Sequence, residues 1–268
     1  MADFDYWRRQ GAEKLFPEVD TMRPEQRRFA GKLLLIGGNK GMFFTVANAM
    51  QEAGKIGVGE CRAVMPDSLK NMVPSTPDIY FAESEVSGAF GQKSLPEMLR
   101  QAEWADAIIL VGDLGKNGET SIVMAEFLNR VDKPIYLTRD AIDAVTADAT
   151  NWSMRDARTI LLASLPQLQK LLRSLYYPKV ITLSMPTNQL VETLHKFTLT
   201  YEMTIVTFHN EQLIVAQNGE IISMGIKDTG YAPISLFNGN LIVKMATLGI
   251  WNLEKTDLKT VTSALMMK

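Results

Sequence analysis

A run of four large aliphatic residues followed by a glycine-rich turn constrains the fold of this chain most. The run occupies residues 33–36 and the turn residues 37–41. Because a half-exposed strand would alternate apolar with polar residues, this run predicts a strand buried on both faces. Helical spacing over residues 42–53 predicts a helix directly after the turn. The stretch is therefore typical of an α/β corner, which either faces an anionic ligand or is simply a tight turn.

The composition is that of an ordinary globular protein. Of 268 residues, 46% are apolar and 22% are charged, so the chain can bury a large core in one α/β domain or two small ones. The formal net charge is −2, and acidic and basic residues are interspersed. The chain therefore lacks the basic surface with which proteins bind nucleic acid or an anionic membrane, and we expect neither partner.

Cysteine content and hydropathy bear on the cellular location. The single cysteine, Cys61, leaves no internal disulfide, as is typical of a reducing compartment, and its apolar surroundings predict a structural thiol rather than a nucleophile. No apolar run approaches the ~18 residues that a membrane-spanning helix needs. These features predict a cytoplasmic protein.

Strands and helices are predicted to alternate over most of the chain. Buried strands are predicted at residues 32–37, 57–66, 107–111, 134–138 and 180–183, with helices between them. Residues 1–31 are predicted to form a helical N-terminal preface. Residues 67–94 lack clear periodicity, so they form a functional loop, a partner surface or a loop that contains a short strand near residues 79–81.

The pattern changes near the C-terminal end. Three short strands are predicted in quick succession, at residues 204–208, 212–217 and 219–224, and Asn218-Gly219 is a strong hairpin signal. A last helix is predicted to begin near Asn240. Without an internal repeat or a linker, residues 1–268 are predicted to form a single domain. The expected fold is doubly wound α/β, with a mostly parallel central sheet flanked by helices and a C-terminal antiparallel hairpin.

Four short segments that follow predicted strands or helices carry a resemblance to a known family. They are residues 37–39, residues 57–59, residues 111–115 and residues 138–142. They are similar to the Gly-Gly-Ser, Gly-x-Gly, Gly-Pro-Gly-Leu-Gly and Asp-Ala-Asp-Ala-Leu segments of the ADP- or ATP-dependent NAD(P)H-hydrate dehydratases. Over roughly residues 30–255 the chain resembles this carbohydrate kinase-like family of the ribokinase-like superfamily.

The resemblance implies a set of site residues. It implies substrate contacts at five positions, nucleotide contacts at two, and the place of the catalytic base at Asn240. The substrate positions are Gly38, Asn39, Thr45, Gly115 and Met185, and the nucleotide positions are Asn238 and Gly239. No set of side chains in the sequence indicates a metal site of the protein itself.

Several of these positions depart from the family pattern. Met185 stands where the family has histidine, Phe237 where it has the first glycine of the phosphate turn, and Asn240 where it has the aspartate base. An amide cannot accept the proton that a carboxylate would accept, and losing a positioned base typically costs about 10²–10⁴ in rate. At Phe237, a bulky side chain also blocks an anion from approaching the backbone of the phosphate turn.

Three functions are therefore considered. The first is an NAD(P)H-hydrate dehydratase-like protein with lost or strongly reduced nucleotide-dependent catalysis, which if active would use ADP or ATP with Mg²⁺. The second is a non-catalytic binding or assembly module on the same scaffold. The third is an active small-molecule kinase of the ribokinase superfamily. The resemblance implies a small-molecule nucleotide as ligand and a homo-oligomer.

Several single residues have a structural as well as a functional interpretation. Asn240 is favoured as a helix N-cap over a catalytic group, and Asp140 as a turn residue over a ligand for Mg²⁺. Asp113 either orients a ribose, repels a phosphate or forms a turn. His195 is predicted to be structural and His209 solvent-exposed, and two histidines with one cysteine do not favour zinc.

Overall fold

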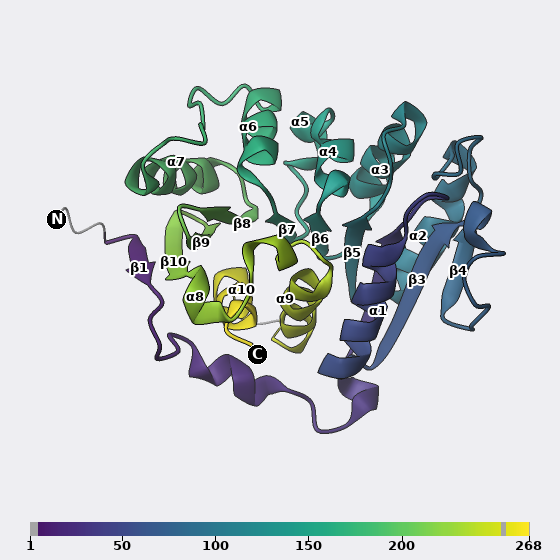
Figure 1. Cartoon of the computed structure of the whole chain (residues 1–268), viewed down its shortest axis with the longest axis horizontal. Coiled ribbons are helices and arrows are strands. Elements are labelled where there is room, and N and C mark those ends of the chain that lie inside the picture. Colours follow the sequence, from purple (N-terminus) through teal and green to yellow (C-terminus); the bar gives the residue numbers. More distant parts are fainter. Residues whose placement is uncertain (1–4, 253–255, 268) are drawn as a thin grey trace.

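One mixed β-sheet of ten strands runs through the molecule (Figure 1). The computed structural model describes residues 5–252 and 256–267. The strands are β1 (Trp7–Arg9), β2 (Lys32–Gly37), β3 (Glu60–Pro66), β4 (Ile79–Ala82), β5 (Ala107–Gly112), β6 (Ile135–Thr138), β7 (Thr159–Leu162), β8 (Thr204–His209), β9 (Gln212–Gln217) and β10 (Glu220–Gly225). Their order is β1-β10-β9-β8-β7-β6-β5-β2-β3-β4.

Within the described strands, β9 runs antiparallel to its neighbours β8 and β10, and every other neighbouring pair is parallel. The hairpin between β9 and β10 turns at Asn218 and Gly219, which have φ values of 49° and 78°. Positive φ at both central residues suits the twist of a two-residue hairpin. The mostly parallel sheet and the C-terminal antiparallel hairpin are thus confirmed.

Helices cover both faces of the sheet (Figure 1). They are α1 (Phe44–Ile56), α2 (Leu95–Trp104), α3 (Gly118–Arg130), α4 (Asp140–Thr146), α5 (Ala149–Trp152), α6 (Leu165–Ser174), α7 (Thr187–Thr200), α8 (Ile226–Thr229), α9 (Asn240–Trp251) and α10 (Asp257–Leu265). One buried cluster contains side chains of the six helices from α2 through α7, which pack on one face of the sheet. A second cluster contains side chains of α1, α9 and α10, which pack on the other face. Alternate residues of β2, Leu33 and Leu34, enter opposite clusters, as a strand buried on both faces requires.

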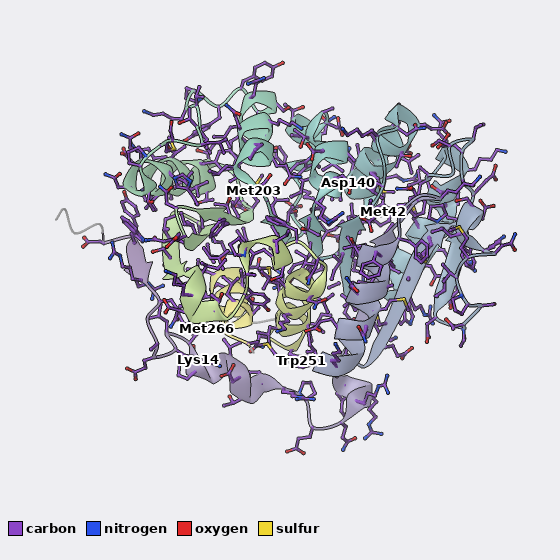
Figure 2. The ribbon with its side chains drawn as sticks, in the orientation of Figure 1. Lys14, Met42, Asp140, Met203, Trp251 and Met266 are labelled. Atoms are coloured by element: carbon purple, nitrogen blue, oxygen red, sulfur yellow. The ribbon has the colours of Figure 1, made fainter. Side chains whose placement is uncertain are left out.

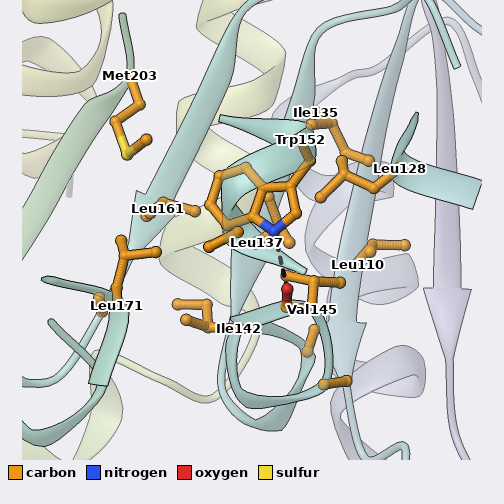
Figure 3. Close-up of a cluster of buried hydrophobic side chains, with 14 of the residues drawn as sticks. Leu110, Leu128, Ile135, Leu137, Ile142, Val145, Trp152, Leu161, Leu171 and Met203 are labelled. Atoms are coloured by element: carbon orange, nitrogen blue, oxygen red, sulfur yellow. Dashed lines mark hydrogen bonds between the residues drawn. The ribbon is translucent and has the colours of Figure 1, made fainter. Parts of the chain in front are cut away.

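A fully buried tryptophan lies in the first of these clusters (Figure 3). Trp152 packs among side chains of β6, β7 and α4, and its indole N–H donates to the Val145 carbonyl oxygen at 2.8 Å. The bond satisfies the polar atom of the indole, so the ring can be buried without an unpaired donor. Within the described residues, no helix is both long and apolar enough to cross a membrane.

The helical preface predicted for residues 1–31 is only partly present in the residues that the structure describes, which begin at residue 5. The segment begins with β1, which pairs in parallel with β10 at the sheet edge. Its later part has two short 3₁₀ turns, Pro17–Met22 and Arg27–Phe29. In Figure 1 this segment runs along the outside of the molecule from the sheet edge toward α1. Its apolar residues suggested a helix, but Phe16 and Val19 instead reach the core from a 3₁₀ turn.

The prediction of the fifth strand at residues 180–183 is also wrong. This segment lies in the loop between α6 and α7, and Val180 and Leu183 are 67% and 72% exposed. The fifth buried strand is β7, whose four residues are all buried. The short strand near residues 79–81 does exist as β4, which pairs with β3 at the other sheet edge.

Candidate functional site

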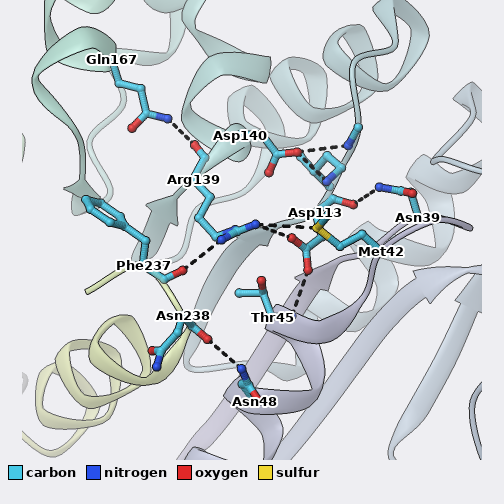
Figure 4. A network of polar contacts seen from close by, with 12 residues as sticks. Asn39, Met42, Thr45, Asn48, Asp113, Arg139, Asp140, Gln167, Phe237 and Asn238 are labelled. Carbon is cyan, nitrogen blue, oxygen red and sulfur yellow. Dashed lines mark hydrogen bonds and ion pairs between the residues drawn. The ribbon is translucent and has the colours of Figure 1, made fainter. Parts of the chain in front are cut away.

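The candidate site lies where the strand order reverses. β2 pairs with β3 on one side and with β5 on the other, so the loops after β2 and β5 diverge to opposite sides. Ligands of open α/β sheets bind at the carboxyl ends of strands at such a point. Asp113 follows β5, Arg139 follows β6, and Thr45 is in the first turn of α1 (Figure 4). Met42 and Asp140, labelled in Figure 2, lie at the same corner.

Asp113 is the central acceptor of this corner. Its carboxylate is fully buried: Oδ2 accepts from the Thr45 N–H at 2.9 Å and Oδ1 from Arg139 Nη2 at 2.8 Å. Its carbonyl oxygen accepts from Asn39 Nδ2 at 2.6 Å. A carboxylate beside the first-turn amides of a helix is favoured by the helix dipole as well as by the hydrogen bond. Asp113 therefore interacts with the start of α1 in the way that the anionic group of a bound ligand would.

Arg139 supplies the positive charge of the corner. Besides Asp113, its guanidinium donates through Nη1 to the Phe237 carbonyl oxygen at 3.3 Å, and Nη2 lies 3.9 Å from Met42 Sδ. The backbone of Arg139 has φ 57° and ψ −144°, a region that residues with a Cβ rarely adopt. Gln167 Nε2 donates to its carbonyl oxygen at 2.6 Å and so helps to hold this conformation. One side chain thus links β5, β6 and the turn before α9.

The turn before α9 packs tightly on α1. Gly239 has φ 98°, and a Cβ at this position would lie 2.9 Å from the Thr45 carbonyl oxygen. Asn238 Oδ1 accepts from the Asn240 N–H at 3.0 Å, and Asn48 Nδ2 donates to the Asn238 carbonyl oxygen at 3.3 Å. The N-cap of α9 is Gly239, so the prediction that Asn240 is the N-cap is wrong by one residue. Asn238 provides the side-chain acceptor instead.

Asp140 holds the turn after β5. Its Oδ2 accepts from the N–H groups of Leu114 and Gly115, at 2.9 and 3.1 Å. Burial raises the pKa of this carboxyl, the backbone donors act in the opposite direction, and the nearby Asp113 raises it further. The turn role weighed for Asp140 is therefore present in the structure.

The structure brings most of the predicted site residues together. Asn39, Thr45, Asn238 and Gly239 take part in the network of Figure 4 or contact it, and Asn240 follows them at the start of α9. The Gly38 N–H donates to the Gly112 carbonyl oxygen at 3.1 Å, beside the same turn.

Met185 lies elsewhere. It precedes α7, and its carbonyl oxygen lies 2.7 Å from Nε2 of His209. His209 is only 4% exposed, so the prediction that it is solvent-exposed is wrong. Because the strand thought to precede Met185 is absent, the segment that follows the fifth buried strand is residues 163–167, which also contain a proline, Pro166. The predicted substrate contact of Met185 stays a prediction.

Sequence reasoning missed Arg139 as a site residue. Two departures from the family pattern could have indicated its role. Asp113 stands where the family has glycine, and Arg139 stands where the family has alanine. Their charges are opposite, and in the structure they form an ion pair across two strand ends. Complementary departures at two motifs could have indicated this contact.

A cleft of about 530 Å³ lies beside the network. Its lining includes Gly115 and Asp140, together with Asn117, which caps α3 by accepting from the Glu119 N–H at 2.7 Å. Lys170 and Asp143 form an ion pair at the cleft. Within residues 5–252 and 256–267, no three His, Cys, Asp or Glu side chains gather into a metal-binding group.

The sheet order and the two helical layers define a ribokinase-like α/β fold. A ribokinase-like superfamily protein of Enterococcus faecalis aligns with a TM-score of 0.62 at 14% identity, covering 99% of this chain and 96% of that one. The ADP/ATP-dependent NAD(P)H-hydrate dehydratase of Bacillus subtilis, co-crystallised with ATP and Mg²⁺, aligns with a TM-score of 0.60 at 15% identity, covering 92% and 84% of the two chains. Identities this low establish the fold alone.

One curated relative matches by sequence. The chain is 31% identical over 116 residues to the bifunctional NAD(P)H-hydrate repair enzyme Nnr of Methanothermobacter thermautotrophicus. The match covers 42% of this chain and 22% of the relative, so the chain spans about a fifth of that protein's length. No family model matches the chain.

Proposed function

We propose that this chain is a relative of the NAD(P)H-hydrate dehydratases that has lost nucleotide-dependent dehydration. The sequence match to an NAD(P)H-hydrate repair enzyme and the shared fold support the relationship. The observation that carries the loss is the Asp113–Arg139 ion pair, which lies against the turn of residues 237–239. That turn is the one at which the resemblance implies phosphate binding.

The residues of this turn do not fit a nucleotide phosphate. The Asn240 N–H of this turn already donates to Asn238 Oδ1 at 3.0 Å, and the turn packs so closely on α1 that a Cβ on Gly239 would lie 2.9 Å from the Thr45 carbonyl oxygen. Asn240, at the implied base position, has an amide that cannot take up a proton at neutral pH. Both the anion position and the base position are therefore unsuited to the dehydratase reaction.

The proposal includes a binding or assembly role on the same scaffold, in the cytoplasm and as a homo-oligomer. The cleft beside Gly115 and Asp140 is a cavity next to the network that could take a small molecule. An active small-molecule kinase is the weaker alternative, because it too needs a carboxylate base near the start of α9.

The direct test is turnover by the native chain. Hydrated NADPH is incubated with the protein, Mg²⁺ and either ADP or ATP, and the near-ultraviolet absorbance of the restored nicotinamide is followed. We expect no rise above the protein-free control, whereas an active dehydratase in the same assay should give a steady rise. Robust turnover with either nucleotide would contradict the proposed loss of catalysis.

A further inference from the structure

The candidate site contains an anion of its own. The Asp113 carboxylate is fully buried and is held by two groups of different kinds, the Thr45 N–H in the first turn of α1 and the Arg139 guanidinium. Helix amides and guanidinium groups are also the groups with which proteins bind the phosphate or carboxylate of a ligand. In this chain a side chain satisfies both of them.

The guanidinium keeps binding capacity beyond this pair. Arg139 Nε is buried and has no hydrogen-bond partner among the described residues, and the arginine side chain as a whole is 32% exposed. The corner is therefore reachable from outside through Arg139, and its cation is neutralised from inside by Asp113. An incoming phosphate would have to displace a carboxylate that is covalently part of the site and already oriented.

We propose that Asp113 is an internal counter-ion that fills the anion position of this corner and makes the native site reject phosphorylated ligands. The inference deepens the proposed function and rests on it for the location of the site. Asp113 is then the residue that selects ligands by their charge. Arg139 is the cation that an external anion would bind if Asp113 were removed.

The test removes the internal anion with little change to the backbone. Asp113 has φ 58°, which glycine adopts without a Cβ penalty, so Asp113→Gly should keep the turn. We expect inorganic phosphate to raise the Tm of this variant by more than it raises that of the native chain, while chloride at the same ionic strength does not separate the two proteins. Calorimetric titration should show ADP binding at least about tenfold tighter to the variant than to the native chain.

Two further variants make the result decisive. Asp113→Gly combined with Arg139→Met should lose the phosphate response, because the cation is gone. If Asp113→Gly does not fold, Asp113→Ala also removes the carboxylate, keeps the Cβ that the native turn already accommodates, and should give the same phosphate-dependent rise in Tm. A folded Asp113 variant without that rise would overturn the inference, as would native binding of ADP as tight as that of the variant.

The two proposals fail on different measurements. The proposed function fails if the native chain turns over hydrated NADPH, which the dehydration assay measures without any substitution. The inference fails if the Asp113 variants show no response to phosphate, which requires no turnover at all.

Discussion

At the scale of single residues, close packing leaves some positions with no space for a side chain. Gly249 lies in the last turn of α9, where that helix packs on β6. A Cβ at this position would lie 2.0 Å from the hydroxyl oxygen of Tyr136. Tyr136 is completely buried and belongs to the second core cluster, so its ring has little freedom to move.

Gly249→Ala should therefore destabilise the protein in spite of the higher helix propensity of alanine. We expect the free energy of unfolding to fall by about 1–3 kcal/mol, the usual cost of overpacking a core. Gly54→Ala is the matched control: Gly54 is also within a helix, α1, but a Cβ there meets nothing within 4 Å. It should gain about 0.5–1 kcal/mol. Urea denaturation of both variants measures the difference, and equal effects would contradict the close contact at Gly249.

Among the single residues of the site, some could be predicted from the sequence and others could not. Glycines and short polar residues in turns, such as Asn39 after β2 and Gly239 before α9, were predictable because turns require their backbone freedom or local hydrogen bonds. The ion pair of Asp113 with Arg139 was not, because its partners are 26 positions apart and meet only when β5 and β6 align. A long-range pair of this kind depends on register, which periodicity does not give.

At the scale of elements, the prediction was good where the hydrophobic pattern was long and poor where it was short. The strand at residues 32–37 and the helix at residues 42–53 were predicted closely, and they correspond to β2 and α1. The short strand β7 was missed, whereas residues 180–183 have a strand-like composition but lie in an exposed loop. Short apolar runs do not decide between a strand and a loop without knowledge of burial.

The C-terminal helix α10 was also missed, because it is short and contains threonine, valine and serine, which are weaker helix formers. It nevertheless packs on α9 and buries Leu265 completely in the second core cluster. We expect Leu265→Ala to lower the free energy of unfolding by about 2–5 kcal/mol, the range for a buried leucine. Met266→Ala, at the adjacent and only partly buried position, should cost distinctly less. If urea denaturation gives the two variants the same small effect, the terminal helix contributes little to stability.

At the scale of the whole molecule, a buried charge couples stability to pH. Asp257, the first residue of α10, is 2% exposed and forms an ion pair with Arg158 at 3.0 Å, next to the start of β8 and the end of β9. Burial raises the pKa of this carboxyl, although Arg158 and Thr204 act in the opposite direction. Since the native pKa is above the unfolded one, the native state binds more protons between the two values.

The contribution of Asp257 to the free energy of unfolding should therefore fall as the pH rises from about 4 through its native pKa. Asp257→Asn removes this contribution and should make the measured slope less negative; Asp140, whose pKa is also raised, contributes with the same sign, and Asp67, whose pKa is lowered, with the opposite sign. The measurement is urea denaturation at a series of pH values from about 4 to about 7. Asp156→Asn, which alters an exposed carboxylate, is the control and should leave the slope unchanged. An unchanged slope in Asp257→Asn would contradict the raised pKa.

The edge strand β1 has a consequence for the order in which the molecule assembles. Trp7 pairs with Ile221, so an early part of the chain takes its place only beside one of the last strands. On a ribosome the early segment emerges long before that partner exists, and closing so long a loop costs entropy. Docking of β1 is thus expected to be a late event, which leaves the outer edge of β10 open for pairing until the segment arrives.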